Sequence, residues 1–330
     1  MRTFNVIDKV YVKSDNSTNH IFSRYTYTLI IFVLLSSFIN ILLGNKNMVF
    51  SLIKTIIISL VFTSIITYII NIFKKKYSYI KIYTEDNTIF ISLILSLFGY
   101  NTNIYILLLS ILISIIFKNI LKDINNACVI YGIIILILYK YLNNIESLFT
   151  ITNNYLLSYN ELNSISILNY LFSIEYLSPV LSVLSFIYLF YKKGIKYNLI
   201  FSYLTTFIIV ILLISIIHNK IWFTLYELLT SNILFISIFI LSDYKISPTI
   251  AEGQVIYGLI LGIITVILRF IIPDLAIILT IILGSLLINK YLDKISYKFK
   301  YNKKFYYHTI GIFLVIMIAF QVILKIYLQS

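Results

Sequence analysis

Long apolar runs separated by short polar segments fill most of the chain. A helix that spans a bilayer needs about 20 consecutive apolar residues. Eleven windows of the sequence suit such helices: 27–44, 49–73, 87–100, 102–121, 124–141, 171–191, 198–217, 221–242, 254–272, 274–290 and 306–327. The pattern therefore predicts an all-α, polytopic integral membrane protein with about 10–11 transmembrane helices.

The window at 87–100 is short, and Gly99-Tyr100-Asn101 breaks the chain directly after it. One interpretation is a complete crossing, and the other is a segment that penetrates only half of the bilayer. A half-penetrating segment is tolerated only where protein covers its free backbone groups. The sequence leaves both interpretations open.

Composition agrees with the apolar pattern. Apolar residues make up 60% of the chain and charged residues 12%, whereas soluble domains are about 45–50% apolar and about 25% charged. Such a chain could not hide its apolar surface from water, which indicates a membrane protein. A soluble enzyme is not supported, because the sequence has no phosphate-binding glycine loop, dinucleotide fingerprint, nucleophile elbow or zinc-ligand spacing. The lone Cys128 excludes an internal disulfide.

Lysine and arginine residues are distributed unevenly between the windows. If residues 1–26 are cytoplasmic, 20 of the 26 basic residues lie on the cytoplasmic side. The positive-inside rule then predicts a cytoplasmic N-terminus and an outer C-terminus, and we expect no signal peptide. The basic residues of the cytoplasmic loops account for the net charge of +13. Such residues set the orientation and meet anionic lipid headgroups, so the charge does not indicate a nucleic-acid partner, and none is expected.

A polar stretch interrupts the apolar sequence near the C-terminal end. Residues 242–274 read SDYKISPTIAEGQVIYGLILGIITVILRFIIPD. Asp, Ser, Pro and Gly each favour turns for separate local reasons, and Pro248 blocks continuation of a helix. We therefore expect a cytoplasmic turn here, which Asp243 caps or braces.

The order and spacing of these residues resemble the membrane subunits RnfD and NqrB of Rnf and sodium-pumping NADH:quinone oxidoreductase complexes. The family pattern is roughly T-D-P-V-T-[SA]-x-[TM]-x-x-G-x-x-I-[YF]-G, then a Leu-rich helix, an Arg and P-[ED]-G. The matching residues are Ser242, Asp243, Ser247, Pro248, Gly253, Ile256, Tyr257, Gly258, Arg269, Pro273 and Asp274.

The resemblance covers residues 27–293 and is strongest over 221–293. It leaves residues 1–26 as a cytoplasmic segment and residues 294–330 as a basic loop with an additional transmembrane helix. It implies a subunit, not catalytic alone, of an ion-translocating electron-transport complex in the bacterial plasma membrane. Its partners would be other membrane subunits and iron–sulfur or flavin subunits.

In that family, the outer loop after the fifth span carries flavin mononucleotide (FMN) joined by a phosphoester to a threonine of D-x-x-[ST]-G-A-T. The loop 142–170 has Ser147 and Thr150 at the matching positions, with Asn in place of Asp and Leu148-Phe149 in place of Gly-Ala. The resemblance thus implies covalent FMN at Thr150. An ordinary turn or capping role for Thr150 is the alternative, and riboflavin or another non-covalent flavin is a further option.

Charged residues within the windows are functional candidates, because each costs at least ~2.5–3.5 kcal/mol near the bilayer centre. Glu175, Glu227 and Arg269 all fall in the outer third of the predicted spans. One interpretation is a structural ion pair between Arg269 and a carboxylate. The other assigns Arg269 to a flavin phosphate, which its planar fork of donors suits. With the resemblance, Glu175, Glu227 and Asp243 become candidates for a Na⁺ or H⁺ pathway.

A rival hypothesis is a divergent relative without redox chemistry, acting as a membrane scaffold or a solute transporter. The Gly-Ala pair of the attachment motif is replaced. The glycine-rich turn that the family carries before the fifth span is reduced to Lys118 and Asn125-Asn126-Ala127. Both losses favour this alternative.

Overall fold

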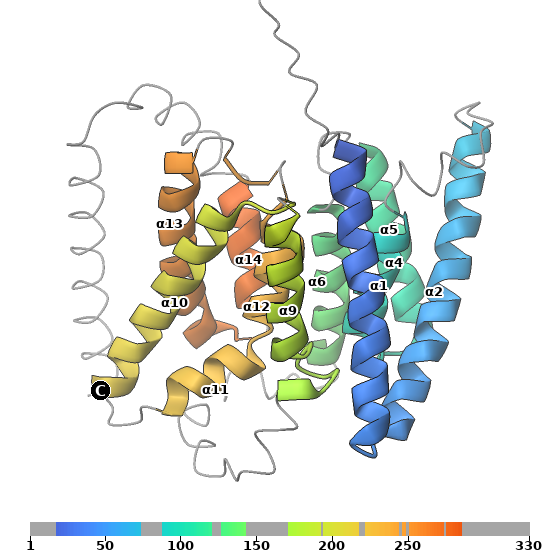
Figure 1. The fold of residues 1–330 in the computed structure, drawn as a ribbon. Coiled ribbons are helices and arrows are strands. Elements are labelled where there is room, and N and C mark those ends of the chain that lie inside the picture. Colours follow the sequence, from blue (N-terminus) through green and yellow to red (C-terminus); the bar gives the residue numbers. More distant parts are fainter. Residues whose placement is uncertain are drawn as a thin grey trace, which may run out of the picture.

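The computed structural model describes residues 18–73, 88–120, 127–142, 171–192, 194–217, 222–243, 246–248, 251–273 and 275–285. Every regular element in these ranges is a helix (Figure 1). The helices are α1 (Thr18–Leu42), α2 (Lys46–Phe73), α4 (Thr88–Gly99), α5 (Ile104–Ile120), α6 (Ala127–Leu142), α9 (Pro179–Tyr191), α10 (Tyr197–Ile217), α11 (Trp222–Thr230), α12 (Ile233–Ile236), the π-helix η2 (Ser237–Leu241), α13 (Ala251–Ile271) and α14 (Ala276–Leu283). The predicted all-α class is confirmed.

Several of these helices are long and apolar enough to cross a membrane. Among the described residues, four helices meet this length and composition without a break, namely Ser23–Leu42, Lys46–Ile70, Tyr197–Ile217 and Ala251–Ile271. The pair α11 and α12–η2 forms a bent fifth candidate, and shorter apolar helices occupy Ile89–Gly99, Ile104–Lys118, Val129–Tyr139 and Pro179–Tyr191. The chain is therefore a multi-pass membrane protein. The window at 306–327 lies outside the described residues.

The helices form two groups that lie side by side in Figure 1. The first contains α1, α2, α4, α5 and α6, and the second contains α9 to α14. Contacts of α1 with α9 and of α6 with α14 join the two groups. Antiparallel neighbours place the start of α1 and the end of α9 at one end of the bundle, which we call the Arg24 end (top of Figure 1). The opposite end, where α11 lies, is the Glu227 end.

The short helix α4 is enclosed by its neighbours. Its 12 residues extend over about 18 Å, less than the ~30 Å hydrocarbon core of a bilayer. It packs against α1, α2, α5 and α6, and every side chain over residues 90–97 is buried. The enclosure provides the protein cover that a half-penetrating segment requires.

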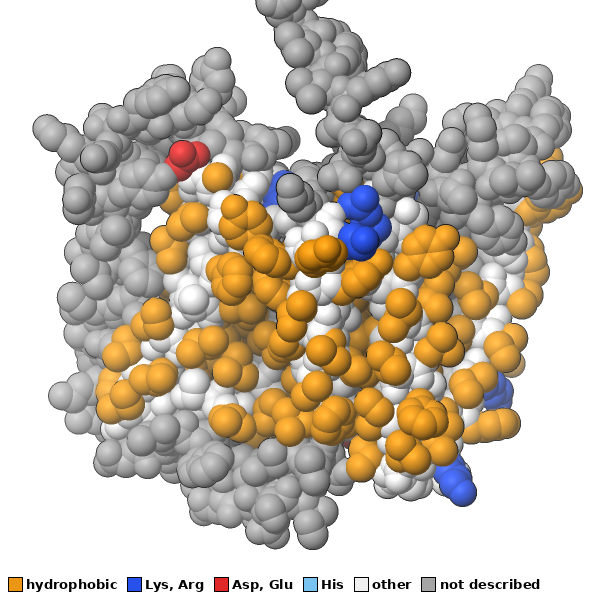
Figure 2. Space-filling view, viewed as in Figure 1, with side chains coloured by type: hydrophobic (Ala, Val, Ile, Leu, Met, Phe, Trp, Pro, Cys, Tyr) orange, Lys and Arg blue, Asp and Glu red, His pale blue; other side chains and the backbone are white. Residues whose placement is uncertain are grey.

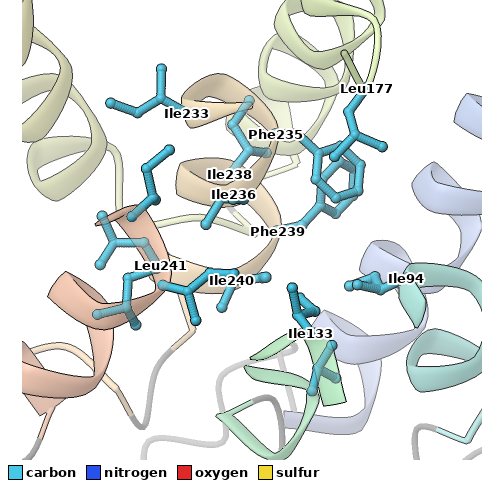
Figure 3. Packing of buried hydrophobic residues seen from close by; sticks show 14 of the residues in the cluster. Ile94, Ile133, Leu177, Ile233, Phe235, Ile236, Ile238, Phe239, Ile240 and Leu241 are labelled. Carbon is cyan, nitrogen blue, oxygen red and sulfur yellow. The ribbon is translucent and has the colours of Figure 1, made fainter. Parts of the chain in front are cut away.

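The α12–η2 segment lies in the middle of the hydrophobic core. Figure 3 shows its side chains between Leu177 and, from the first group, Ile94 and Ile133. The ring centroids of Phe235 and Phe239 lie 4.7 Å apart. Phe235 also contacts Phe32 of α1, at 5.2 Å between centroids. These large apolar contacts tie the two groups of helices together.

Two glycines let α13 approach α10 closely. A Cβ atom on Gly258 would lie 2.8 Å from the carbonyl oxygen of Leu199 and 2.9 Å from the backbone nitrogen of Tyr203. A Cβ atom on Gly262 would lie 3.1 Å from the carbonyl oxygen of Tyr203. Small residues four positions apart are a common device for close packing of membrane helices, and this pair explains why Gly258 is part of the polar motif.

Two predicted windows are interrupted in the structure. The window at 171–191 contains a turn before α9, because Leu177 and Ser178 adopt left-handed φ values of 47° and 31°. The side chain of Ser178 then accepts a hydrogen bond from the backbone N–H of Leu181, and Pro179 occupies the first turn of α9. Serine followed by proline is a typical helix start. The second interruption, in the window at 221–242, forms part of the candidate site.

Candidate functional site at a broken membrane helix

The eighth predicted span is broken at Ser231 and Asn232. The two helical pieces meet at an angle of 53°, and Asn232 adopts a left-handed φ of 58°. Asparagine tolerates this conformation better than most residues. The N–H of Ile236 donates to the carbonyl oxygen of Asn232, which starts α12. A break at this position requires protein cover when it lies within a membrane.

A buried ion pair lies beside this break. Arg269 Nε donates to Glu227 Oε2 at 2.7 Å, and the side chains of Arg269 and Glu227 are 8% and 0% exposed. Arg269 Nη1 also donates to the carbonyl oxygen of Pro273 at 2.7 Å. The pair therefore links α11 to the last turn of α13, where a cation also suits the negative end of the helix dipole.

Two further oxygen atoms at the break are buried. Ser231 Oγ and Asn232 Oδ1 have no hydrogen-bond partner within the described part of the chain. Most buried polar atoms in folded proteins have a partner, so an exception needs an explanation. Chemically, a hydroxyl and an amide oxygen close in sequence to a carboxylate are suitable ligands for a water molecule or a hard cation.

The polar stretch at the Arg24 end forms a braced turn. Ser247 Oγ donates to the carbonyl oxygen of Asp243 at 2.8 Å, which confirms a turn at this position. Tyr257 OH donates to the carbonyl oxygen of Ile246 at 3.3 Å. Ser242 Oγ and Tyr25 OH share a hydrogen bond of 2.6 Å, which connects the turn to α1.

A lysine that sequence reasoning missed completes this turn. Lys196 is 7% exposed, and its Nζ donates to Ser247 O and Ser247 Oγ at 2.9 Å and to Pro248 O at 3.1 Å. Its ammonium thus binds a cluster of neutral oxygen atoms between α10 and the turn. In the sequence it lies close to Lys192 and Lys193, and no local signal separates it from these neighbours.

The structure brings together two of the predicted site residues. Glu227 and Arg269 form one pair, as the ion-pair interpretation predicts. Glu175 is exposed in the turn before α9. Asp243 is buried, but it lies at the opposite end of the α12–η2 segment. Ser147 and Thr150 lie outside the described residues, and their role in flavin attachment stays a prediction.

The fold and the buried pair indicate a membrane protein with a polar site, a description that fits many transport proteins. The family model described as NQR2, RnfD, RnfE family matches residues 6–298. This chain belongs to that family. The resemblance found in residues 242–274 is therefore confirmed, and the chain is a membrane subunit of an Rnf- or Nqr-type complex. A comparison with curated proteins finds no match.

Proposed function

We propose that this RnfD/NqrB-type subunit helps to couple electron transfer to the movement of Na⁺ or H⁺ and carries FMN on its outer side. The observation that carries the coupling role is the broken span with its buried Glu227 carboxylate and two unpartnered oxygens, Ser231 Oγ and Asn232 Oδ1. Discontinuous helices with buried polar groups form the ion sites of many transporters.

Arg269 sets the electrostatics of this proposed site. Its guanidinium already pairs with Glu227 and with the carbonyl oxygen of Pro273, so it balances the carboxylate when no cation is present. A cation that approaches Glu227 competes with Arg269 for the same oxygen atoms. Entry and exit of the cation would then depend on how this competition changes with the redox state of the complex.

The test of the coupling role is ion uptake by the complex reconstituted in liposomes. The variant Glu227→Gln removes the negative charge, and we expect ion uptake to fall at least tenfold while electron transfer continues. The double variant Glu227→Gln with Arg269→Gln serves as a neutral-pair control for folding. Normal ion uptake in a folded Glu227→Gln complex would contradict the role.

The flavin role rests on the spacing of Ser147 and Thr150. The described chain resumes at Leu171, next to Phe172, whose carbonyl oxygen accepts a hydrogen bond from Asn40 Nδ2 near the end of α1. The loop would therefore rejoin the bundle at the Glu227 end, as an outer flavin requires. A flavin supplies one- and two-electron chemistry when bound, while the protein positions it.

Covalent attachment is tested on protein produced together with a flavin transferase. Intact-mass spectrometry should find the added mass of FMN, and a denaturing gel should show a fluorescent band that Thr150→Ala removes. Ser147→Ala is the matched control and should keep the band. An unmodified mass for the wild-type protein would rule out covalent FMN.

The rival function is a scaffold or solute transporter without redox chemistry. The observation that favours it is the bulk of Leu148 and Phe149, where the family's attachment motif has Gly and Ala. Gene neighbourhood separates the two functions. Adjacent genes for other Rnf-type subunits and a flavin transferase support the redox role, and their absence supports the rival.

A further inference from the structure

A groove runs along the outside of the molecule between α1 and α9. It has a volume of about 130 Å³. Its walls include Ile31, Phe32 and Leu35 of α1 and Leu181, Leu184 and Tyr188 of α9. Ile31 and Leu184 are 52% and 53% exposed, so the groove opens onto the surface of the molecule, where hydrophobic side chains predominate between its two ends (Figure 2).

The two small polar side chains in the groove, Thr28 and Ser185, already use their hydroxyl protons. Thr28 Oγ1 donates to the carbonyl oxygen of Tyr25 at 2.8 Å, and Ser185 Oγ donates to the carbonyl oxygen of Leu181 at 2.8 Å. Both hydroxyl protons are used within their own helices. Apart from the Tyr188 hydroxyl, the remaining wall side chains are hydrocarbon, and they suit an apolar chain better than a polar molecule.

Two basic side chains stand at the Arg24 end of the groove. Arg24 precedes Thr28 by four residues on α1, which places it on the helix face that lines the groove. Lys192 follows directly after α9, and its Nζ lies 5.7 Å from the centroid of the Tyr191 ring at the same end of the molecule. Arg24 Nη1 donates to the carbonyl oxygen of Lys192 at 2.6 Å. This bond fixes the guanidinium across the mouth of the groove. Its other N–H donors make no hydrogen bond with the described residues.

We propose that the α1–α9 groove binds an anionic phospholipid. Part of one acyl chain lies in the groove, and Arg24 and Lys192 bind the phosphate of the headgroup. The planar fork of an arginine matches phosphate oxygens, and the Lys192 ammonium adds a second charge. The positive-inside distribution predicts this end to be cytoplasmic, the side where basic residues meet anionic headgroups.

The size of the groove argues for a lipid rather than a helix of a partner subunit. One turn of a helix with its side chains, about 10–12 Å wide and about 5.4 Å long, occupies roughly 400–600 Å³, which is too large for a groove of about 130 Å³. A chain of methylene groups is much narrower. The inference does not depend on the proposed redox or coupling role, since it rests on a separate surface of the molecule.

Native mass spectrometry of the purified full-length protein tests the proposal. Dioleoyl phosphatidylglycerol and dioleoyl phosphatidylcholine have the same acyl chains, and only the first carries a net negative charge. We expect the wild-type protein to retain phosphatidylglycerol preferentially. Arg24→Gln and Lys192→Gln should each weaken this binding roughly fivefold, which corresponds to about 1 kcal/mol per basic residue.

Matched variants separate the site from general charge and folding effects. Lys46→Gln removes an exposed lysine at the Glu227 end and should leave binding unchanged, while Arg24→Lys keeps the charge and should bind better than Arg24→Gln. Ser185→Phe fills the groove and should reduce retention of the lipid. Val183→Phe changes a residue of α9 that does not line the groove and should have no effect.

Three results would overturn the proposal. The first is equal retention of the two lipids by the wild-type protein, and the second is equal loss of binding in Lys46→Gln and Arg24→Gln. The third comes from a photoreactive residue placed at Leu184 in the assembled complex. Cross-links to lipid support the assignment, whereas cross-links to a partner subunit show that protein occupies the groove.

Discussion

The α12–η2 segment has buried charged side chains near both of its ends, and their surroundings differ. They are Lys196 and Asp243 at one end and Glu227 and Arg269 at the other. At the Arg24 end, the Lys196 ammonium binds three oxygen atoms of a turn that is itself internally hydrogen-bonded. At the Glu227 end, two opposite charges pair with each other, while the adjacent Ser231 Oγ and Asn232 Oδ1 have no partner among the described residues. The first arrangement stabilises a turn. The second leaves oxygen atoms ready for a ligand.

The positive-inside distribution predicts that the Glu227 end is outside and the Arg24 end is cytoplasmic, and cysteine labelling tests this orientation most sharply. Cys128 is first replaced by serine, and single cysteines are placed at Leu42 of the Glu227 end and at Tyr191 of the Arg24 end, which are 71% and 79% exposed. A membrane-impermeant maleimide added to intact cells should label Leu42→Cys and spare Tyr191→Cys. The reverse pattern would show that the predicted orientation is wrong.

Removal of one charge at the Glu227 end should have the largest effect on stability. Arg269→Gln removes the guanidinium that pairs with the Glu227 carboxylate, which is 0% exposed. Breaking a buried pair in this way costs about 3–5 kcal/mol. Unfolding in SDS monitored by circular dichroism measures the change. The double variant with Glu227→Gln should recover part of the loss, and a fully additive loss would show that the two side chains do not interact.

Removal of the Lys196 charge, at the Arg24 end, should lower stability by a smaller amount. Lys196→Met keeps the apolar stem and loses the ammonium that binds Ser247 and Pro248. Hydrogen bonds to charged groups contribute about 1.5–3 kcal/mol, and we expect a loss of roughly 2–3 kcal/mol in the same unfolding assay. Lys54→Met, at an exposed lysine of α2, is the control. Equal stability of the two variants would show that the Lys196 ammonium does not stabilise the fold.

Replacing Asn232, whose backbone forms the break, should give the smallest change in stability. Asn232 has a φ of 58°, where an ordinary L-residue is disfavoured by about 1–2 kcal/mol. Asn232→Ala should therefore lower stability by about that amount. Asn232→Gly adopts this φ freely and should lose less. If alanine were tolerated better than glycine, the left-handed conformation at this position would be in doubt.

Hydropathy was sufficient to predict the helical class and the positions of the long helices, because lipid exposure requires near-continuous apolar sequence. It did not locate the break at Ser231, since polar residues such as Thr230, Ser231 and Asn232 are also common inside unbroken membrane helices. The dipeptide Ser178-Pro179 is typical of a helix start and could have located the beginning of α9. It lies within a long apolar run, so hydropathy alone predicted one continuous helix.

The candidate site was predictable only in part. Glu227 and Arg269 stood out because charged residues are rare in spans, but their partnership joins residues 42 positions apart and depends on how the tertiary fold brings the end of α13 to α11. Lys196 could not be recognised at all. Its role comes from the oxygen atoms of the turn, which local sequence around Lys196 does not reveal.

The most direct test removes the unpartnered oxygen atoms at the break and keeps its backbone. The double variant Ser231→Ala with Asn232→Gly deletes both atoms, leaves the Glu227–Arg269 pair in place and allows the left-handed φ. In reconstituted complexes, we expect electron transfer within about twofold of wild type and several-fold fewer ions moved per electron. An unchanged number of ions per electron would show that these atoms take no part in ion movement.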